Sequence, residues 1–340
     1  MNSDGIDLGD RPSAGAAPGV SIVVPVLNEE RYLESTVRRL LDQVYDGPLE
    51  VVLALGPSHD NTDSVARSLA ETDLRVHLVD NPSGRTPTGL NLAIAASHYP
   101  YVVRCDGHAE VPHDYVAVAI ETLERTGADN VGGIMAAQGI TPFEMAVARA
   151  MTTPLGVGGA SFHVGGNEGP APTVYLGAFR RTALERVGGY DETMVRAQDW
   201  EMNLRIRDTG GLIWFTPNMR VTYRPRGSIR ALAKQYFDYG RWRREVVRRH
   251  PDTISARYLA APAAVTGVSI GTLAGLIAAG GGQTWLSVGW LAPIGYLLLI
   301  SLGSLVVGRG LPVSSWWRLP IVLATMHGSW GLGFITGSKA

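Results

Sequence analysis

The triplet Asp106-Gly107-His108 carries the sharpest chemical signal in the chain, directly after an apolar segment at residues 101–105. A tight turn at the glycine would present Asp106 and His108 to one divalent cation. A carboxylate oxygen suits Mg²⁺ or Mn²⁺, and an imidazole shifts the preference towards Mn²⁺. Taken alone, the triplet is better explained as a solvated β-turn whose histidine bonds to the backbone.

Three further polar loops follow apolar segments. They read NEE at 28–30, GPSHDNT at 56–62 and NPSGRT at 81–86. Each alone is ordinary capping and turn chemistry, with Asp60 or Asn61 as an N-cap and Gly84 in a turn. Four such loops at one edge of a sheet favour a binding site.

The elements that position these loops follow an alternating pattern. Apolar, strand-like runs at 20–27, 49–55, 74–79 and 101–105 are separated by helix candidates at 31–44, 62–70 and 88–97. This order predicts an α/β fold with a mostly parallel sheet and helices on both faces. Ligands of such sheets bind at the carboxyl ends of the strands, where the four loops lie.

A membrane domain is predicted at residues 258–340. Charged residues make up 18% of the chain, yet residues 258–307 contain none. Segments 258–278 and 286–307 are each long enough to cross a hydrocarbon core roughly 30 Å thick. A third segment, 319–336, is shorter and contains His327, so it is either a short span or a re-entrant piece.

Residues 228–257 are strongly basic. Their apolar positions recur at helical spacing, which predicts an interfacial helix on anionic lipid. Arginines cluster before the first span, at positions 241, 243, 244, 248, 249 and 257. The positive-inside rule therefore predicts a multi-pass protein of the cytoplasmic membrane whose N-terminal region faces the cytoplasm, with the C-terminus outside if all three segments span.

Bulk composition excludes several classes of protein. A net charge of −1 argues against nucleic acid as a partner, and the single Cys105 excludes a disulfide framework. Residues 1–19 are rich in Gly, Ala, Ser and Pro and are predicted to be a disordered leader rather than a signal peptide.

Taken together, the motifs resemble the family 2 inverting glycosyltransferases of the GT-A fold. The resemblance rests on VSIVVPVLNEE at 20–30, SHDNT at 58–62, NPSGRTPTGLN at 81–91, Asp106, VGGYD at 187–191 and QDWE at 198–201. It covers about residues 20–250 and implies a catalytic domain at 20–227. DGH at 106–108, GGNEG at 165–169 and QYFDYGRW at 235–242 look most like membrane-anchored, succinoglycan-type glucosyltransferases of exopolysaccharide synthesis.

The resemblance implies a role for each matching residue on the donor side. Pro25 and Glu29 would border the base and ribose of a nucleotide sugar, Asp60 is the acid of the second loop, and Arg85 would lie near the phosphates. Arg241 and Trp242 match the basic-aromatic pair that closes over the diphosphate.

Asp199 matches the general base of the family, and Asp106 the first acid of its metal motif. His108 replaces the second acid, and Leu55-Gly56-Pro57 replaces an acidic pair, so part of the base recognition must be supplied differently. We expect burial beside Trp200 and Met202 to raise the pKa of Asp199. The structural alternative is that Asp199 caps a helix at 200–208.

The function implied is transfer of a hexose, from UDP-glucose or a similar donor and with a divalent metal, to a lipid-linked or cell-surface glycan. A polyprenyl-phosphate sugar synthase, a processive synthase and a non-catalytic nucleotide-binding subunit are the alternatives. Residues 156–169 form either a linker or a loop that orders over the donor through His163 and Glu168.

Overall fold

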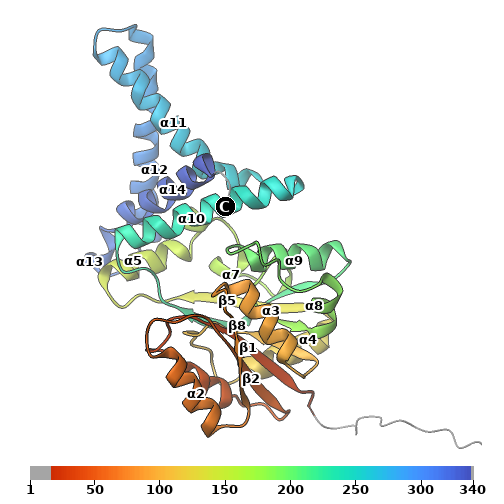
Figure 1. The fold of residues 1–340 in the computed structure, drawn as a ribbon. Coiled ribbons are helices and arrows are strands. Elements are labelled where there is room, and N and C mark those ends of the chain that lie inside the picture. The colour runs from red at the N-terminus through yellow and green to blue at the C-terminus, as the bar shows by residue number, and fades with distance from the viewer. Residues whose placement is uncertain (1–16, 338–340) are drawn as a thin grey trace, which may run out of the picture.

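The computed structural model describes residues 17–337, in which helices flank an eight-stranded sheet and an apolar helical hairpin rises from one side (Figure 1). Along the sheet the strands lie in the order β3 (Val76–Asp80), β2 (Leu49–Leu55), β1 (Val20–Val26), β4 (Tyr101–Arg104), β7 (Tyr175–Arg180), β5 (Asn130–Ala137), β8 (Ile213–Tyr223) and β6 (Gly169–Pro170). Most of the predicted leader, residues 1–16, lies outside the described part of the chain.

The first four strands confirm the predicted parallel sheet. Strands β1 (Val20–Val26), β2 (Leu49–Leu55), β3 (Val76–Asp80) and β4 (Tyr101–Arg104) pair in parallel. They alternate with helices α1 (Leu33–Leu41), α2 (Thr62–Thr72) and α3 (Thr86–Ala96). Successive side chains of a strand point to opposite faces. Ile22 and Val24 accordingly pack in one buried cluster with Leu33, whereas Val23 packs in the other with Leu90.

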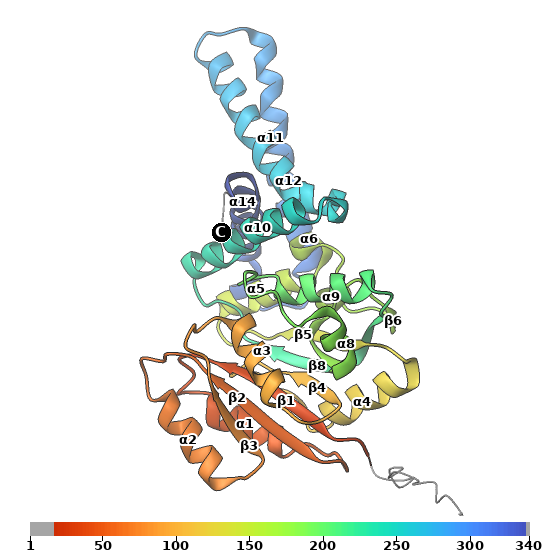
Figure 2. The same cartoon turned by 45° about the vertical axis from the view of Figure 1, so that its right-hand side comes forward.

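The second half of the sheet is mixed. It comprises β5 (Asn130–Ala137), β6 (Gly169–Pro170), β7 (Tyr175–Arg180) and β8 (Ile213–Tyr223). Strand β7 lies antiparallel between β4 and β5, while β8 is parallel to β5. Helices α4 (Tyr115–Thr126), α5 (Pro142–Met151), α8 (Arg181–Val187) and α9 (Gln198–Asp208) accompany these strands (Figure 2). Two one-turn helices occur here: α6 (Pro154–Val157) overlaps the start of the predicted loop at 156–169, and α7 (Ser161–Val164) lies within it.

The C-terminal helices are α10 (Ile229–Arg249), α11 (Ala256–Ala279), α12 (Leu291–Val307), α13 (Val313–Trp316) and α14 (Leu319–Thr336). Three helical segments of the described chain, 256–279, 284–307 and 313–336, are long and apolar enough to cross a membrane. Helices α11 and α12 form the hairpin that projects away from the sheet. Small residues let the two arms approach, since Gly271 of α11 lies against the backbone of Gly289, just before α12, and against Ala292 of α12.

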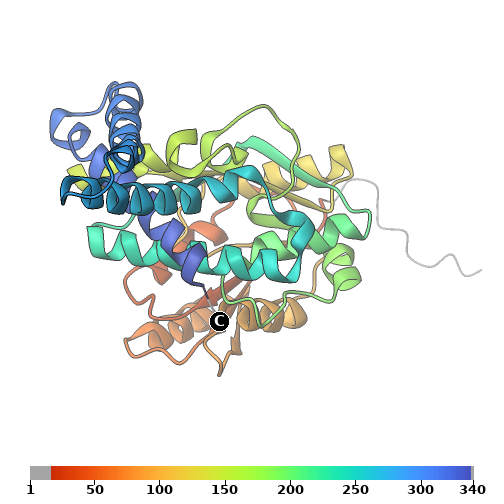
Figure 3. The ribbon, with the colours of Figure 1, turned by 90° about the horizontal axis from the view of Figure 1, so that it is seen from above.

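Helix α14 is packed differently from α11 and α12. A third of its most apolar window is buried inside the protein, against 17% for each of the other two segments. Gly240 of α10 and Gly333 of α14 bring the two backbones together, and Leu232 and Tyr236 of α10 are buried in a cluster with residues of α14. Seen from above, these teal to blue helices lie over the sheet domain (Figure 3). The apolar face of α10, expected on lipid, is thus largely covered by protein.

Candidate functional site

Arg104 joins two carboxylates from distant parts of the chain. It is the last residue of β4 and is only 4% exposed. Its Nη2 lies 3.1 Å from Oδ1 of Asp106, and its Nη1 donates a hydrogen bond to Oδ1 of Asp199. The carboxyl end of β4 and the start of α9 therefore meet at one buried guanidinium, which brings the predicted metal ligand and the predicted base together.

The backbone before Asp199 is held in an uncommon conformation. Helix α9 begins at Gln198, and Ala197 precedes it in the left-handed region with φ +60°. A non-glycine residue there costs of order 1–3 kcal/mol and is found mostly at functional sites. The prediction that Asp199 caps the helix is wrong. Asp199 lies inside the first turn, Ala197 occupies the cap position without a side-chain bond, and the Asp199 carboxylate binds Arg104 instead.

The environment of Asp199 suits a proton acceptor. Burial raises the pKa of Asp199, while the charge of Arg104 opposes that rise and the charge of Asp106 adds to it. The direction matches the expectation, but the opposing cation was not foreseen. No protein partner for Oδ2 of Asp199 is present in residues 17–337, so that oxygen is free to accept a proton. The neighbouring Cys105 is buried, and burial raises its pKa to about 12, so its thiol is inert.

His108 binds Glu29. Its Nδ1 lies 2.7 Å from Oε1 of Glu29, and that hydrogen bond raises the pKa of His108. Nε2 of His108 has no hydrogen bond within the described chain. A carboxylate on one ring nitrogen with the other nitrogen free is the arrangement that orients metal-ligating histidines. Asp106 and His108 thus fit a divalent cation, with Glu29 behind the imidazole. No group of three or more suitable side chains occurs among residues 17–337, so further ligands would come from substrate or water.

Asp60 holds the first two loops together. Its Oδ1 accepts from the backbone N–H of Thr62 at 3.1 Å, and its Oδ2 accepts from the N–H of Glu30 at 3.3 Å. Hydrogen bonds from Thr62 lower the pKa of Asp60. Pro25 is half-buried near the end of β1, opposite Ala54 of β2. Both residues therefore shape the strand ends at which a nucleotide would bind.

A basic pocket of about 490 Å³ lies between the third loop and α10. It is lined by Arg85, Thr193, Val195, Arg196, Lys234, Asp238, Arg241 and Trp242. Asp238 pairs with Lys234 at 2.9 Å, which leaves three arginines without a carboxylate in the pocket. Nε of Arg241 is buried and has no partner in the described chain. Uncompensated guanidinium groups suit a diphosphate, which they bind bidentately. Three of the predicted donor residues are thus brought together.

Trp242 connects this pocket to the carboxylates. The side chain is 7% exposed and packs in a small cluster with Met194 and Val246, against which Ala197 and Trp200 also lie. Ala197 and Trp200 flank Asp199 in sequence. The wall of the basic pocket is therefore also the support of the turn that carries Asp199.

Two site residues were missed from sequence. Arg104 could have been found from the sequence. It is a charged residue at the end of an apolar strand, and it stands two positions before Asp106, so the two side chains are expected on the same face. Arg196 had none beyond its nearness to Asp199. Glu168, a candidate donor contact, is instead held by Arg125 at 2.5 Å and by Nε1 of Trp214 at 2.9 Å.

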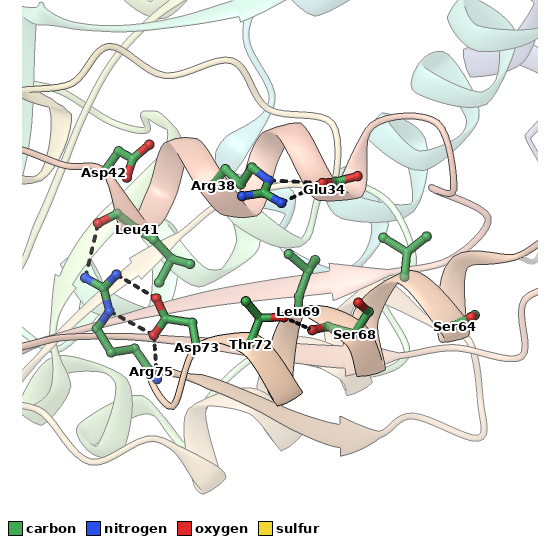
Figure 4. Close-up of a pocket in the computed structure, with 11 residues that line it drawn as sticks. Glu34, Arg38, Leu41, Asp42, Ser64, Ser68, Leu69, Thr72, Asp73 and Arg75 are labelled. Atoms are coloured by element: carbon green, nitrogen blue, oxygen red, sulfur yellow. Dashed lines mark hydrogen bonds and ion pairs between the residues drawn. The ribbon is translucent and has the colours of Figure 1, made fainter.

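A second cleft, of about 380 Å³, lies between α1 and α2 (Figure 4). Its charges are already satisfied, since Arg38 pairs with Glu34 and Arg75 pairs with Asp73. It is lined largely by the later turns of both helices, away from the strand ends that carry the polar loops. We therefore assign it no part in the chemistry.

The chain is similar to several known proteins. The family model described as "Glycosyl transferase family 2" matches residues 21–188. "Succinoglycan biosynthesis protein ExoA" of Rhizobium meliloti (strain 1021) is 31% identical over 318 residues, covering 92% of this chain and 93% of that protein. A Methanococcus voltae protein is 24% identical over 239 residues, covering 68% and 74% of the two chains. It is named "Dolichyl N-acetyl-alpha-D-glucosaminyl phosphate 3-beta-D-2,3-diacetamido-2,3-dideoxy-beta-D-glucuronosyltransferase".

Among solved structures, the fold is shared with "Mannosyltransferase PcManGT from Pyrobaculum calidifontis in complex with GDP-Man and Mn2+". The TM-score is 0.59 at 21% identity, and the match covers 92% of this chain and 88% of the other. The predicted GT-A fold is thereby confirmed.

Proposed function

Since the chain belongs to glycosyltransferase family 2, we propose that it is a membrane-anchored inverting hexosyltransferase with Asp199 as its base. The observation that carries the proposal is the bridge through Arg104, which sets Asp199 beside Asp106 at the carboxyl end of β4. The donor proposed is a UDP-hexose and the acceptor a lipid-linked or cell-surface glycan, reached from the cytoplasmic side. The Methanococcus voltae relative, whose name includes a lipid-linked sugar, favours such an acceptor over bare polyprenyl phosphate.

The residues divide the reaction between them. The acceptor hydroxyl loses its proton to the free Oδ2 of Asp199 while its oxygen bonds to the anomeric carbon. The bond from that carbon to the diphosphate breaks, and the electron pair leaves with the diphosphate oxygen. Arg85 and Arg241, with Arg196, stabilise that charge in the basic pocket. A divalent cation held by Asp106 and His108 would neutralise part of the diphosphate charge and make it a better leaving group.

Arg104 is a positioning residue in this scheme. Because it bonds only Oδ1 of Asp199, it fixes the orientation of the carboxylate and leaves the other oxygen for the proton. Its charge also opposes the rise in the pKa of Asp199 that burial causes.

The test is nucleoside diphosphate release from UDP- and GDP-hexoses by the full chain in membranes, with Mn²⁺ or Mg²⁺ and polyprenyl-linked acceptors. We expect Asp199→Asn to abolish transfer while donor binding stays near normal, and EDTA to stop turnover reversibly. Asp46→Asn, an exposed change outside the site, is the matched control. Turnover by Asp199→Asn would refute the assignment of the base. Failure of every donor with the wild-type chain would favour the non-catalytic nucleotide-binding alternative.

A further inference from the structure

Arg243 of α10 lies between two aromatic rings that belong to different parts of the molecule. Its guanidinium carbon is 4.6 Å from the ring centre of Trp200 on α9 and 4.3 Å from that of Tyr258 on α11. Trp200 follows Asp199, and Tyr258 lies in the first turn of the first apolar helix. Arg243 therefore sits between the proposed base and the start of the membrane hairpin.

This guanidinium has no counter-ion within residues 17–337. No carboxylate pairs with Arg243, and its Nη1 is buried without a hydrogen-bond partner. Burial lowers the pKa of Arg243, and the charge of Arg257 lowers it further. Arg257 lies 4.7 Å from the same Tyr258 ring and donates from Nη2 to its hydroxyl at 2.7 Å. Two cations thus meet at one tyrosine, and leaving a buried charge uncompensated is costly.

The helix beside these arginines also presents unpaired donors. Helix α11 has 24 residues, its first turn contains no acidic residue, and Ser255 at the cap position makes no side-chain cap. The Ser255 hydroxyl is buried without a partner in the described chain. The first N–H groups of a helix and its dipole favour an anion. The positive charge of Arg257 also acts on His163 of α7: burial, and then that charge, lower the pKa of His163 to about 4.

We infer that Arg243, Arg257 and the start of α11 form a binding site for a phosphate group carried by a lipid. The inference rests on the proposed function. These groups lie where the first apolar helix begins, and Arg243 contacts Trp200, the residue after Asp199. A phosphate bound here would hold a lipid-linked acceptor with its sugar towards the base. The phosphate has two sources, the acceptor itself or an anionic phospholipid of the bilayer.

The probe is farnesyl diphosphate, with farnesol as its uncharged counterpart. The full chain is placed in phosphatidylcholine nanodiscs with saturating UDP and Mn²⁺, so that the donor pocket is filled, and binding is followed by tryptophan fluorescence. We expect Arg243→Gln to weaken farnesyl diphosphate binding about 10- to 100-fold, the effect of losing charge-assisted hydrogen bonds. Arg257→Gln, an exposed change that carries little risk to folding, should weaken it in the same direction. Farnesol binding should not change.

Arg230→Gln is the matched control, because Arg230 is exposed on the same helix and has no ion pair within the described chain. An equal loss in Arg230→Gln would overturn the site in favour of general attraction between a basic helix and lipid. Equal binding by wild type and both site variants would also overturn it. Phosphatidylglycerol nanodiscs separate the two sources. If the phosphatidylglycerol bilayer displaces farnesyl diphosphate, the site binds phospholipid head groups. If farnesyl diphosphate stays bound, the site is specific for the phosphate of the acceptor. Either result supports a phosphate site.

The proposed function fails separately. If the wild-type chain transfers sugar from no donor, the enzymatic role is wrong while the binding test still stands. If the wild type transfers sugar and both site variants bind farnesyl diphosphate normally, only the phosphate site is wrong.

Discussion

Replacing Arg104 with glutamine should move the pH dependence of sugar transfer. The proposed base Asp199 can accept a proton only when it is ionised, so the rate should fall as the pH drops through its pKa. Arg104 is the one cation paired with that carboxylate in the described chain, and it lowers the pKa against the effect of burial. Without it, burial and the charge of Asp106 act unopposed, and the acidic limb of the profile must shift to higher pH.

The size of the shift follows from the contact. Two unit charges about 4 Å apart interact by about 4 kcal/mol at an effective dielectric constant of about 20. Since part of this is offset by solvation, an opposite charge at such distance typically changes a carboxyl pKa by about one to three units. We therefore expect the acidic limb of kcat/KM to move up by about one to three pH units in Arg104→Gln.

The assay is UDP release over a pH series, with kcat/KM reporting the free enzyme. Arg104→Lys is the matched variant, because it keeps the charge but lacks the fork that reaches both carboxylates. In Arg104→Lys the acidic limb of the kcat/KM profile should stay near the wild-type pH, while kcat falls. Removing a buried partner costs about 3–5 kcal/mol of stability, so the folded amount will fall in Arg104→Gln. The pH at which the acidic limb lies does not depend on how much of the protein is folded. An unmoved limb in Arg104→Gln, or an equal shift in Arg104→Lys, would refute the reasoning.

Three further outcomes are expected. Ala197→Gly relieves a left-handed backbone conformation that costs about 1–3 kcal/mol. The thermal midpoint should therefore rise, and kcat should fall because the turn before Asp199 loosens. A lower thermal midpoint would contradict the assignment of strain to Ala197. Glu29→Gln should weaken Mn²⁺ activation about 10- to 100-fold, through the orientation of His108, and titration of activity with Mn²⁺ measures this. Hydrogen bonds from Arg248, and then Arg249, lower the pKa of Glu245 to about 2. The ionised Glu245 therefore stabilises the folded protein fully above about pH 4.5, and this contribution to the free energy of unfolding is lost as the pH falls towards 2. Melting curves should therefore separate Glu245→Gln from wild type at pH 7 and bring the two together near pH 2.

The parallel half of the sheet and its helices were predictable because their signals are local. Each strand is a short apolar run, each helix follows a polar loop, and parallel order forces the loops to one edge. The antiparallel insertion of β7 between β4 and β5 was not predictable. Residues 175–180 are apolar like the others, and no local feature records the direction of the neighbouring strands.

The same distinction holds within the site. Asp106, His108 and Asp199 could be singled out because residue types and motifs mark them, although their roles remain proposals. What the sequence did not contain is the connection between them. The bond between Arg104 and Asp199 joins residues 95 positions apart, and the contact between His108 and Glu29 joins residues 79 apart. Such contacts depend on the completed sheet, and they decide whether a carboxylate caps a helix or binds a buried arginine.

Helix α10 shows why a basic pattern alone is ambiguous. Consecutive residues of an α-helix point about 100° apart, so four in a row face all sides. Arg241 lines the basic pocket, Trp242 packs against the turn of Asp199, and Arg243 lies over Tyr258 of the hairpin. Arg244 donates from Nη1 to the carbonyl oxygen of Phe334 at 2.9 Å, near the end of α14. One turn of one helix therefore contacts the proposed donor site, the turn that carries the proposed base, the hairpin and α14. A displacement of the apolar helices would therefore be transmitted through α10 to the proposed site.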